Sequence, residues 1–312
     1  MYVIKMKTII YYFAVFAITI ASIGIIKLHA GSASVFPAST VTQNGNNEIS
    51  SESSAQAGEA LPSAIGEKKT EVPILMYHNI FRSSSGHGNY IISEAAFEQD
   101  LKFLKDNGYT TIVMQDLIDF VYDGKALPEK PVVLTFDDGY SNNFLYAYPL
   151  LEKYNSKAVL SIIGYYTDLY TKSPDENPSY SHVTWDNIKK MMDSKLVELQ
   201  NHSYNLHTTD KGRNGTKKKR DESDQQYRKI LSEDLGKLQD EFKSNTGYTP
   251  STFTYPFGSV SNASFEIIKE LGFKASLSCE SGMNKVSRDP ECLYMMKRYL
   301  RTPNKSAEDI LN

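Results

Sequence analysis

The chain has 312 residues, of which 40% are hydrophobic and 23% charged, and its formal net charge is −3. This length allows one large domain or two small ones, and the charge balance does not indicate nucleic-acid binding. Only two cysteines occur, Cys279 and Cys292. The chain is therefore not a disulfide-rich scaffold, and these two residues could equally form one disulfide or remain thiols.

The amino terminus has the pattern of an export signal or a membrane anchor. Lys5 and Lys7 precede an uncharged apolar run at residues 9–26, and Lys27 follows it. This run lies between the length of a signal-peptide core and that of a full membrane span, so a cleaved signal and an uncleaved anchor both remain open. The lysines before the run predict that the amino terminus stays in the cytoplasm and that the body is exported.

Composition divides the chain into three segments. Residues 1–30 form the predicted signal peptide or anchor. Residues 31–70 are rich in Ser, Ala, Asn, Gly and Glu and poor in large apolar groups, which predicts a flexible linker. Residues 71–312 form the predicted folded domain. We therefore expect an extracellular protein that is either membrane-anchored or secreted to the cell surface.

From residue 71 onward, strand and helix patterns alternate. Short apolar runs predict strands at 74–77, 110–113, 132–136, 158–163, 196–199, 252–255, 274–277 and 294–297. Capping residues predict helices that begin after Ser93, Thr184, Ser223 and Ser261, and an apolar face predicts another over residues 144–154. Repeated strand–helix units imply parallel strands and fit a (β/α) barrel. We expect it to be distorted or incomplete because its first and last units are weak.

The predicted strand at 132–136 ends in Asp137, Asp138 and Gly139. Adjacent carboxylates raise each other's pKa unless a cation or a shared proton intervenes, although an Asp-Asp-Gly surface turn is the alternative. In (β/α) barrels the functional side chains lie at the carboxyl ends of the strands. We therefore expect one mouth to collect the acid pair and the residues that follow other strands, which are His78, His202 and the run Tyr255-Pro256-Phe257-Gly258.

His202 and His207 are the candidate partners of the acid pair. On an ideal helix this spacing places the two side chains about 140° apart, but a turn after a strand can bring them together. With Asp138 they would supply three ligands and leave positions open for water and substrate, which is typical of a catalytic metal site. Imidazole and carboxylate ligands favour Zn²⁺, and Co²⁺, Ni²⁺ or Fe²⁺ are also compatible.

These motifs carry a resemblance to a known family. The segments Thr135–Tyr140 and His202–His207 resemble those of the polysaccharide deacetylases, the NodB-like carbohydrate esterase family 4, whose fold is a distorted (β/α) barrel. The resemblance covers about residues 71–302. The spacing of the two histidines, the run Tyr255–Gly258 and the opening Ile74–His78 look most like the poly-N-acetylglucosamine deacetylase branch.

The resemblance implies a role for each motif residue. Asp137 would be the general base, while Asp138 and the two histidines would bind the metal. His78 would be the general acid, as in the branch that the chain resembles, and a buried structural histidine is the alternative. Many members have an arginine in the third motif that contacts the base, but Phe253–Pro256 has none. Arg298 or Arg301 could replace it, although a solvated surface arginine is the favoured interpretation for both.

The resemblance also implies the activity. We expect a metal-dependent N-deacetylase that acts on N-acetylglucosamine units of a surface polysaccharide. A backbone N–H near Gly139 or Tyr140 could bind the oxyanion, with the oxyanion and substrate site formed by Tyr140, Tyr255, Pro256 and Phe257. Peptidoglycan N-deacetylation, acetylxylan esterase activity and non-catalytic carbohydrate binding are the alternatives.

The expected partners are few. They are the N-acetylated polysaccharide and, if the amino-terminal segment is uncleaved, the membrane; we expect a monomer. The basic segment 211–220 is predicted to be a solvated loop, and attraction of an anionic wall polymer is its alternative role.

Overall fold

The computed structural model describes residues 69–83 and 88–312. The predicted signal or anchor, and all of the predicted linker except its last two residues, lie outside the described residues. Within the described ranges, none of the helices has the length and apolarity needed to span a bilayer.

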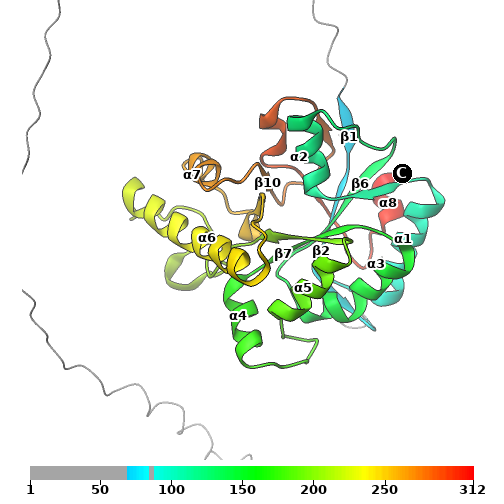
Figure 1. Cartoon of the computed structure of the whole chain (residues 1–312), viewed down its shortest axis with the longest axis horizontal. Coiled ribbons are helices and arrows are strands. Elements are labelled where there is room, and N and C mark those ends of the chain that lie inside the picture. The colour runs from blue at the N-terminus through cyan, green and yellow to red at the C-terminus, as the bar shows by residue number, and fades with distance from the viewer. Residues whose placement is uncertain (1–68, 84–87) are drawn as a thin grey trace, which may run out of the picture. The chain divides into compact units, whose positions relative to one another are not determined.

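Eight parallel strands form the main sheet, in the order β10-β9-β8-β7-β6-β2-β12, with β5 paired to β6. The strands are β2 (Ile74–Tyr77), β5 (Thr110–Ile112), β6 (Pro131–Phe136), β7 (Ala158–Ile162), β8 (Val197–Asn201), β9 (Thr252–Thr254), β10 (Ala275–Leu277) and β12 (Tyr299–Leu300). A parallel bridge from Leu277 to Met296, shortly before β12, links the two ends of this order. The sheet is thus a curled, distorted (β/α) barrel, as predicted (Figure 1).

Helices surround the sheet (Figure 1). They are α1 (Glu94–Asp106), α2 (Met114–Asp123), α3 (Tyr148–Tyr154), α4 (Gly164–Lys172), α5 (Trp185–Asp193), α6 (Asp224–Thr246), α7 (Ser264–Glu270) and α8 (Ala307–Leu311). A π-helix, η2 (Asn143–Ala147), leads into α3, and short 3-10 turns form η3 (Asp210–Gly212), η4 (Pro256–Gly258) and η5 (Pro290–Leu293). Two small two-stranded sheets complete the fold. In one, β1 (Thr70–Val72) pairs with β11 (Asn284–Val286), and in the other, β3 (Asn79–Phe81) pairs with β4 (Ile91–Ser93).

Three of the four predicted capping residues cap a helix. The side chains of Ser93, Thr184 and Ser223 each accept a backbone N–H in the first turn of α1, α5 and α6. The prediction for Ser261 is wrong, because α7 begins only at Ser264. The hydroxyl of Ser261 instead accepts the N–H of Lys218 at 3.0 Å, and so serves a loop that precedes α6.

The last predicted strand is also misplaced. We expected residues 294–297 to be extended, but Met295 has a left-handed φ of 58°, which interrupts the run. Only Met296 makes a β-bridge there, and the strand proper is β12.

A buried ion pair joins α1 to the carboxyl-terminal segment. Asp100, which is 2% exposed, accepts hydrogen bonds from Arg301 Nε at 2.7 Å and from the Tyr77 hydroxyl at 3.2 Å. Its other oxygen accepts the N–H of Ala307 at the start of α8. Arg301 is itself 5% exposed, so the expectation of a solvated arginine is wrong at this position. The pair fixes the chain just beyond β12.

This pair predicts a large stability effect. Asp100→Ala leaves the Arg301 guanidinium buried without a counter-charge, and we expect the free energy of unfolding to fall by about 3–5 kcal/mol. Urea denaturation measures it. Asp106→Ala, at an exposed position on the same helix, is the control and should change stability by less than about 0.5 kcal/mol. If the two substitutions lowered the free energy of unfolding equally, the buried ion pair would contribute no more to stability than an exposed residue does.

Candidate active site

A cavity of about 430 Å³ opens where the parallel strands β2, β6 and β8 end. It collects the predicted residues that follow these strands, namely His78, Asp137, Asp138, His202 and His207. The remaining wall is formed by Met76, Asn79, Tyr90, Tyr140, Phe257, Cys279 and Leu300. The expected convergence of strand ends on one mouth is therefore present.

The pleat of β6 explains how Asp137 reaches this cavity. The side chains of Val132, Leu134 and Phe136 pack into a cluster with residues of α1, α3, α5 and α6. Val133 belongs to a second cluster, which gathers residues of the strands β2, β7 and β10 and of α2. Because successive side chains of a strand point to opposite faces, Asp137 lies on the same face of the β6 direction as Val133, which is the inside of the curled sheet. His202 likewise extends the parity of Gln200 on β8, whose side chain is fully buried.

Asp138 has the opposite parity and needs a backbone turn to reach the same cavity. The left-handed conformation begins at Asp138 itself, whose φ is 71°, and continues at Gly139 with φ 74°. A Cβ on Gly139 would lie 2.9 Å from Cγ2 of Ile162, so a side chain is excluded there. This strained turn aims both carboxylates at one mouth.

Asp138, His202 and His207 form a compact group of ligand atoms. One ligand atom from each lies within 4.8 Å of the others. Nε2 of His202 and Nε2 of His207 lie 3.5 and 3.2 Å from Asp138 Oδ1. That oxygen is buried and has no hydrogen-bond partner of good geometry. An orphaned carboxylate oxygen facing two imidazole nitrogens fits a cation.

The orientation of His202 also fits a metal ligand. Its Nδ1 lies 2.8 Å from the carbonyl oxygen of Thr254, so Nδ1 carries the proton and Nε2 keeps its lone pair for the cavity. Burial lowers the pKa of His202, but Asp138 and Asp137 raise it by more.

His207 provides a neutral imidazole. Burial and the neighbouring His202 lower the pKa of His207 to about 4. Its ring lies 4.2 Å from that of Phe257, measured between centroids, which holds the imidazole against the cavity wall. At neutral pH its nitrogen is thus available as a ligand.

Asp137 is held by an arginine that sequence reasoning assigned to the surface. Arg298 is fully buried and donates from Nη1 to Oδ1 at 2.7 Å and from Nη2 to Oδ2 at 2.8 Å. The Ser278 carbonyl and the Thr135 hydroxyl fix the guanidinium from behind. Burial raises the pKa of Asp137, but Arg298 and His202 lower it by more, so the net shift is well downward. The expectation of a solvated Arg298 is wrong, and the group replacing the third-motif arginine is identified.

His78 lines the cavity directly after the end of β2. Its ring makes an edge contact with Tyr90, at 4.7 Å between centroids, and its buried Nδ1 has no hydrogen-bond partner. Burial lowers the pKa of His78, although Asp137 and Asp138 oppose the shift. In the substrate-free cavity this histidine is therefore mainly neutral at pH 7.

The four residues predicted to form the oxyanion and substrate site divide into two groups. Tyr140 and Phe257 line the cavity. The side chain of Tyr255 does not reach it, because this residue is fully buried and its hydroxyl lies 2.7 Å from Ser264 Oγ at the start of α7. Pro256 is also absent from the wall and begins the turn η4. Tyr255 and Pro256 instead position the backbone of Phe257, whose φ is 57°.

Both cysteines are thiols rather than a disulfide. Cys292 is partly buried in the turn η5, while Cys279 lines the cavity beside Arg298. Cys279 and Tyr90 were not among the predicted site residues, since neither belongs to a recognisable motif.

Comparisons with known proteins agree with this geometry. A family model described as polysaccharide deacetylase matches residues 124–276. The Escherichia coli (strain K12) protein named poly-beta-1,6-N-acetyl-D-glucosamine N-deacetylase is 26% identical over 232 residues, which cover 69% of this chain but only 34% of that relative. Bacillus subtilis (strain 168) YxkH, whose name carries the description polysaccharide deacetylase, is 30% identical over 241 residues, or 77% of this chain and 75% of the relative.

A solved structure extends the comparison to the fold. A de-N-acetylase from Aggregatibacter actinomycetemcomitans superposes with a TM-score of 0.66 at 26% identity, covering 77% of this chain and 98% of that one. The chain belongs to the polysaccharide deacetylase family, carbohydrate esterase family 4, as its motifs predicted.

Proposed function

We propose that the chain is a metal-dependent N-deacetylase that hydrolyses the acetamide of N-acetylglucosamine units in a polymer of the poly-N-acetylglucosamine type. The observation that carries the proposal is the orphaned Asp138 Oδ1 facing two imidazole nitrogens, directly beside the Arg298-bound carboxylate of Asp137. The name of the Escherichia coli relative supports the choice of polymer. The amino-terminal pattern of residues 1–30 supports action outside the cytoplasm.

Asp138, His202 and His207 would hold the metal. The donor set of one carboxylate and two imidazoles favours Zn²⁺, with Co²⁺, Ni²⁺ and Fe²⁺ as compatible ions. When bound, a divalent ion supplies Lewis acidity, which polarises a carbonyl group and makes water more acidic.

Asp137 would act as the general base. Because Arg298 keeps its carboxylate ionised and fixes its orientation, Asp137 can accept the proton of the attacking water throughout the neutral pH range. A backbone N–H at Gly139 or Tyr140, in the turn that follows the acids, would donate to the oxyanion. Tyr140 and Phe257 would position the sugar from the walls of the cavity.

His78 would deliver a proton to the leaving nitrogen. Since His78 is mainly neutral before substrate binds, it must first gain a proton, and the one that Asp137 removes from water is available in the same cavity. The two carboxylates favour the resulting imidazolium. This balances the reaction, with one proton leaving the water and one reaching the amine.

The acid role predicts a specific kinetic effect. In His78→Ala, acetate release from N-acetylglucosamine oligomers should fall by about 10²–10⁴-fold, while metal content and thermal unfolding stay close to those of the wild type. His78→Gln, which keeps a polar side chain but transfers no proton, should be equally slow. Undiminished turnover in either variant would exclude the role.

Acetate release tests the function as a whole. The purified chain is incubated with N-acetylglucosamine oligomers, peptidoglycan and acetylxylan, each with and without a chelator. We expect release from the oligomers that the chelator abolishes. Faster release from peptidoglycan or acetylxylan would reassign the substrate, and no release from any polymer with any metal would leave a non-catalytic carbohydrate-binding protein.

A further inference from the structure

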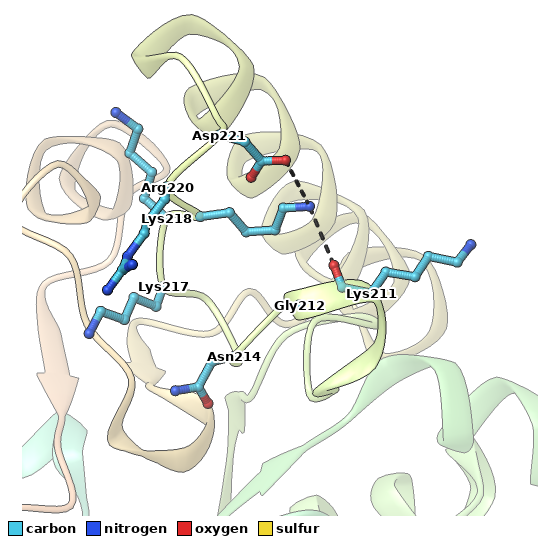
Figure 2. A pocket seen from close by; sticks show the side chains of 8 residues that line it. Lys211, Gly212, Asn214, Lys217, Lys218, Arg220 and Asp221 are labelled. Atoms are coloured by element: carbon cyan, nitrogen blue, oxygen red, sulfur yellow. Dashed lines mark hydrogen bonds and ion pairs between the residues drawn. The ribbon is translucent and has the colours of Figure 1, made fainter.

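The basic loop, residues 211–220, forms a second cavity that the proposed function does not use. This cavity of about 400 Å³ is lined by residues between positions 211 and 221, and the basic ones are Lys211, Lys217, Lys218, Lys219 and Arg220 (Figure 2). Asp221 is the one acidic residue among the eight that line it. The wall is therefore strongly cationic.

Part of this charge is neutralised and part is not. Arg213 pairs with Glu222, Lys218 with Asp224, and Lys219 with Asp221 at 3.7 Å. Lys219 also donates to the carbonyl of Lys211 at 3.4 Å.

Three cations remain without an ion pair among the described residues, and they are Lys211, Lys217 and Arg220. The side chains of Lys217 and Arg220 extend to the same side of the loop (Figure 2). Their charges add in one place, which gives a concave wall that attracts anions.

The basic loop is fixed to the domain. Thr216 is fully buried, its hydroxyl donates to the Ser259 carbonyl at 3.1 Å, and its own carbonyl accepts from the Tyr227 hydroxyl at 2.8 Å. Lys218 N–H adds the bond to Ser261 described above. A fixed loop can bind with little loss of conformational entropy.

The same loop touches the wall of the catalytic cavity. Gly215 has a φ of 57°, and a Cβ there would lie 2.7 Å from the Pro256 carbonyl and 3.3 Å from the Phe257 ring. Phe257 lines the catalytic cavity and packs against His207. The backbone of the basic loop is thus in contact with a residue that would touch the sugar, which places this loop next to the catalytic cavity.

We propose that the basic cavity binds phosphate groups of a phosphodiester-containing glycan whose N-acetylated sugar enters the catalytic cavity. The proposal rests on the N-deacetylase activity, and it replaces the neutral polymer named above with a glycan that carries phosphodiesters. Lysine and arginine are the side chains best suited to phosphate. A neutral N-acetylglucosamine polymer presents no group for this cavity, and its cationic product would be repelled. Contact with Phe257 favours a glycan over a membrane surface.

The test is a binding measurement on the full chain with polyglycerol phosphate, a soluble phosphodiester polymer. We expect saturable binding that weakens as salt rises. In the double variant Lys217→Gln/Arg220→Gln, affinity should fall at least about tenfold, because two charged hydrogen-bond donors are lost. Lys102→Gln/Lys172→Gln, which removes the same charge at exposed positions on α1 and α4, should bind like the wild type.

Two further arms connect the cavity to catalysis and exclude a lipid ligand. Polyglycerol phosphate should raise the apparent KM for a neutral N-acetylglucosamine oligomer at least threefold in the wild type and not in Lys217→Gln/Arg220→Gln. Without polymer, the two proteins should share the same KM within about twofold. Phosphatidylglycerol vesicles should bind no more tightly to the wild type than to the double variant.

Any of four results would overturn the proposal. The polymer does not bind, or the two double variants lose the same affinity for it. Alternatively, the polymer binds but leaves the KM unchanged, or only the binding of vesicles, and not of polymer, depends on Lys217 and Arg220. Polymer binding does not require turnover. Normal binding with no acetate release from any substrate would therefore refute the deacetylase function, and normal release with no polymer binding would refute only the phosphate site.

Discussion

Asp137→Asn is expected to slow acetate release by on the order of 10³–10⁴-fold while the protein still binds one metal ion per site. The amide cannot accept the water proton, but it leaves Asp138, His202 and His207 intact. Acetate release and metal content are measured on the same preparation. Loss of metal equal to that in Asp138→Ala would contradict the division of roles between the two acids.

A control is needed because the substitution also leaves Arg298 without its counter-charge. That uncompensated guanidinium should cost about 3–5 kcal/mol of stability. The double variant Asp137→Asn/Arg298→Met removes both charges, so it should regain much of this stability without regaining turnover. Recovery of turnover in the double variant would show that the single variant failed through misfolding.

Arg298→Met is expected to change both the rate and its dependence on pH. With the guanidinium gone, burial raises the pKa of Asp137 with less opposition, so a larger share of the carboxyl is protonated at a given pH. Turnover at pH 7 should fall by about 10²-fold and rise as pH increases, because only the ionised form accepts a proton. In the wild type, whose Asp137 pKa is well below its usual value, this group causes no such rise above about pH 5.

The pH profile separates a catalytic effect of Arg298 from a structural one. Arg228→Met, which removes an exposed arginine paired with Glu270 on the helical surface, is the matched control and should keep the wild-type profile. A uniformly reduced but unshifted profile in Arg298→Met would indicate that Arg298 only stabilises the fold.

The parallel barrel and its mouth were predictable because they follow from local patterns. Apolar runs of strand length alternate with capped amphipathic segments, and parallel strands place their carboxyl ends at one edge. Two helices that escaped prediction, α2 and α4, lack such signals, because they begin after Val113 and Ile163, whose side chains cannot cap a helix. The short helix α8 was missed although Ser306 caps it by accepting the N–H of Asp309.

The site was predictable only as far as its motifs extend. The Asp-Asp-Gly turn and the two histidines carry their own local signal. Arg298 lies 161 residues from Asp137 in sequence, and only closure of the barrel brings them together. Its neighbourhood was misread because the left-handed Met295 displaces the last strand, so that Arg298 points into the barrel rather than following a strand into solvent.

Side-chain direction was the other limit. Tyr255 belongs to a recognisable motif, yet its ring packs with Phe253 and its hydroxyl meets Ser264, away from the cavity. Conversely, strict strand alternation would have turned Asp138 outward, and only its φ of 71° reverses this. Single backbone dihedrals of this kind depend on the packing around them, here the close contact of Gly139 with Ile162.

Metal content and acetate release, measured together on the wild type, Asp138→Ala and His207→Ala before and after chelation, test the central claim most directly. We predict that the wild type binds a divalent ion. Its acetate release from N-acetylglucosamine oligomers should stop on chelation and return when Zn²⁺ is restored. Both variants should lose the ion and the activity together. Full acetate release from metal-free wild type, or from either variant without bound metal, would contradict the account.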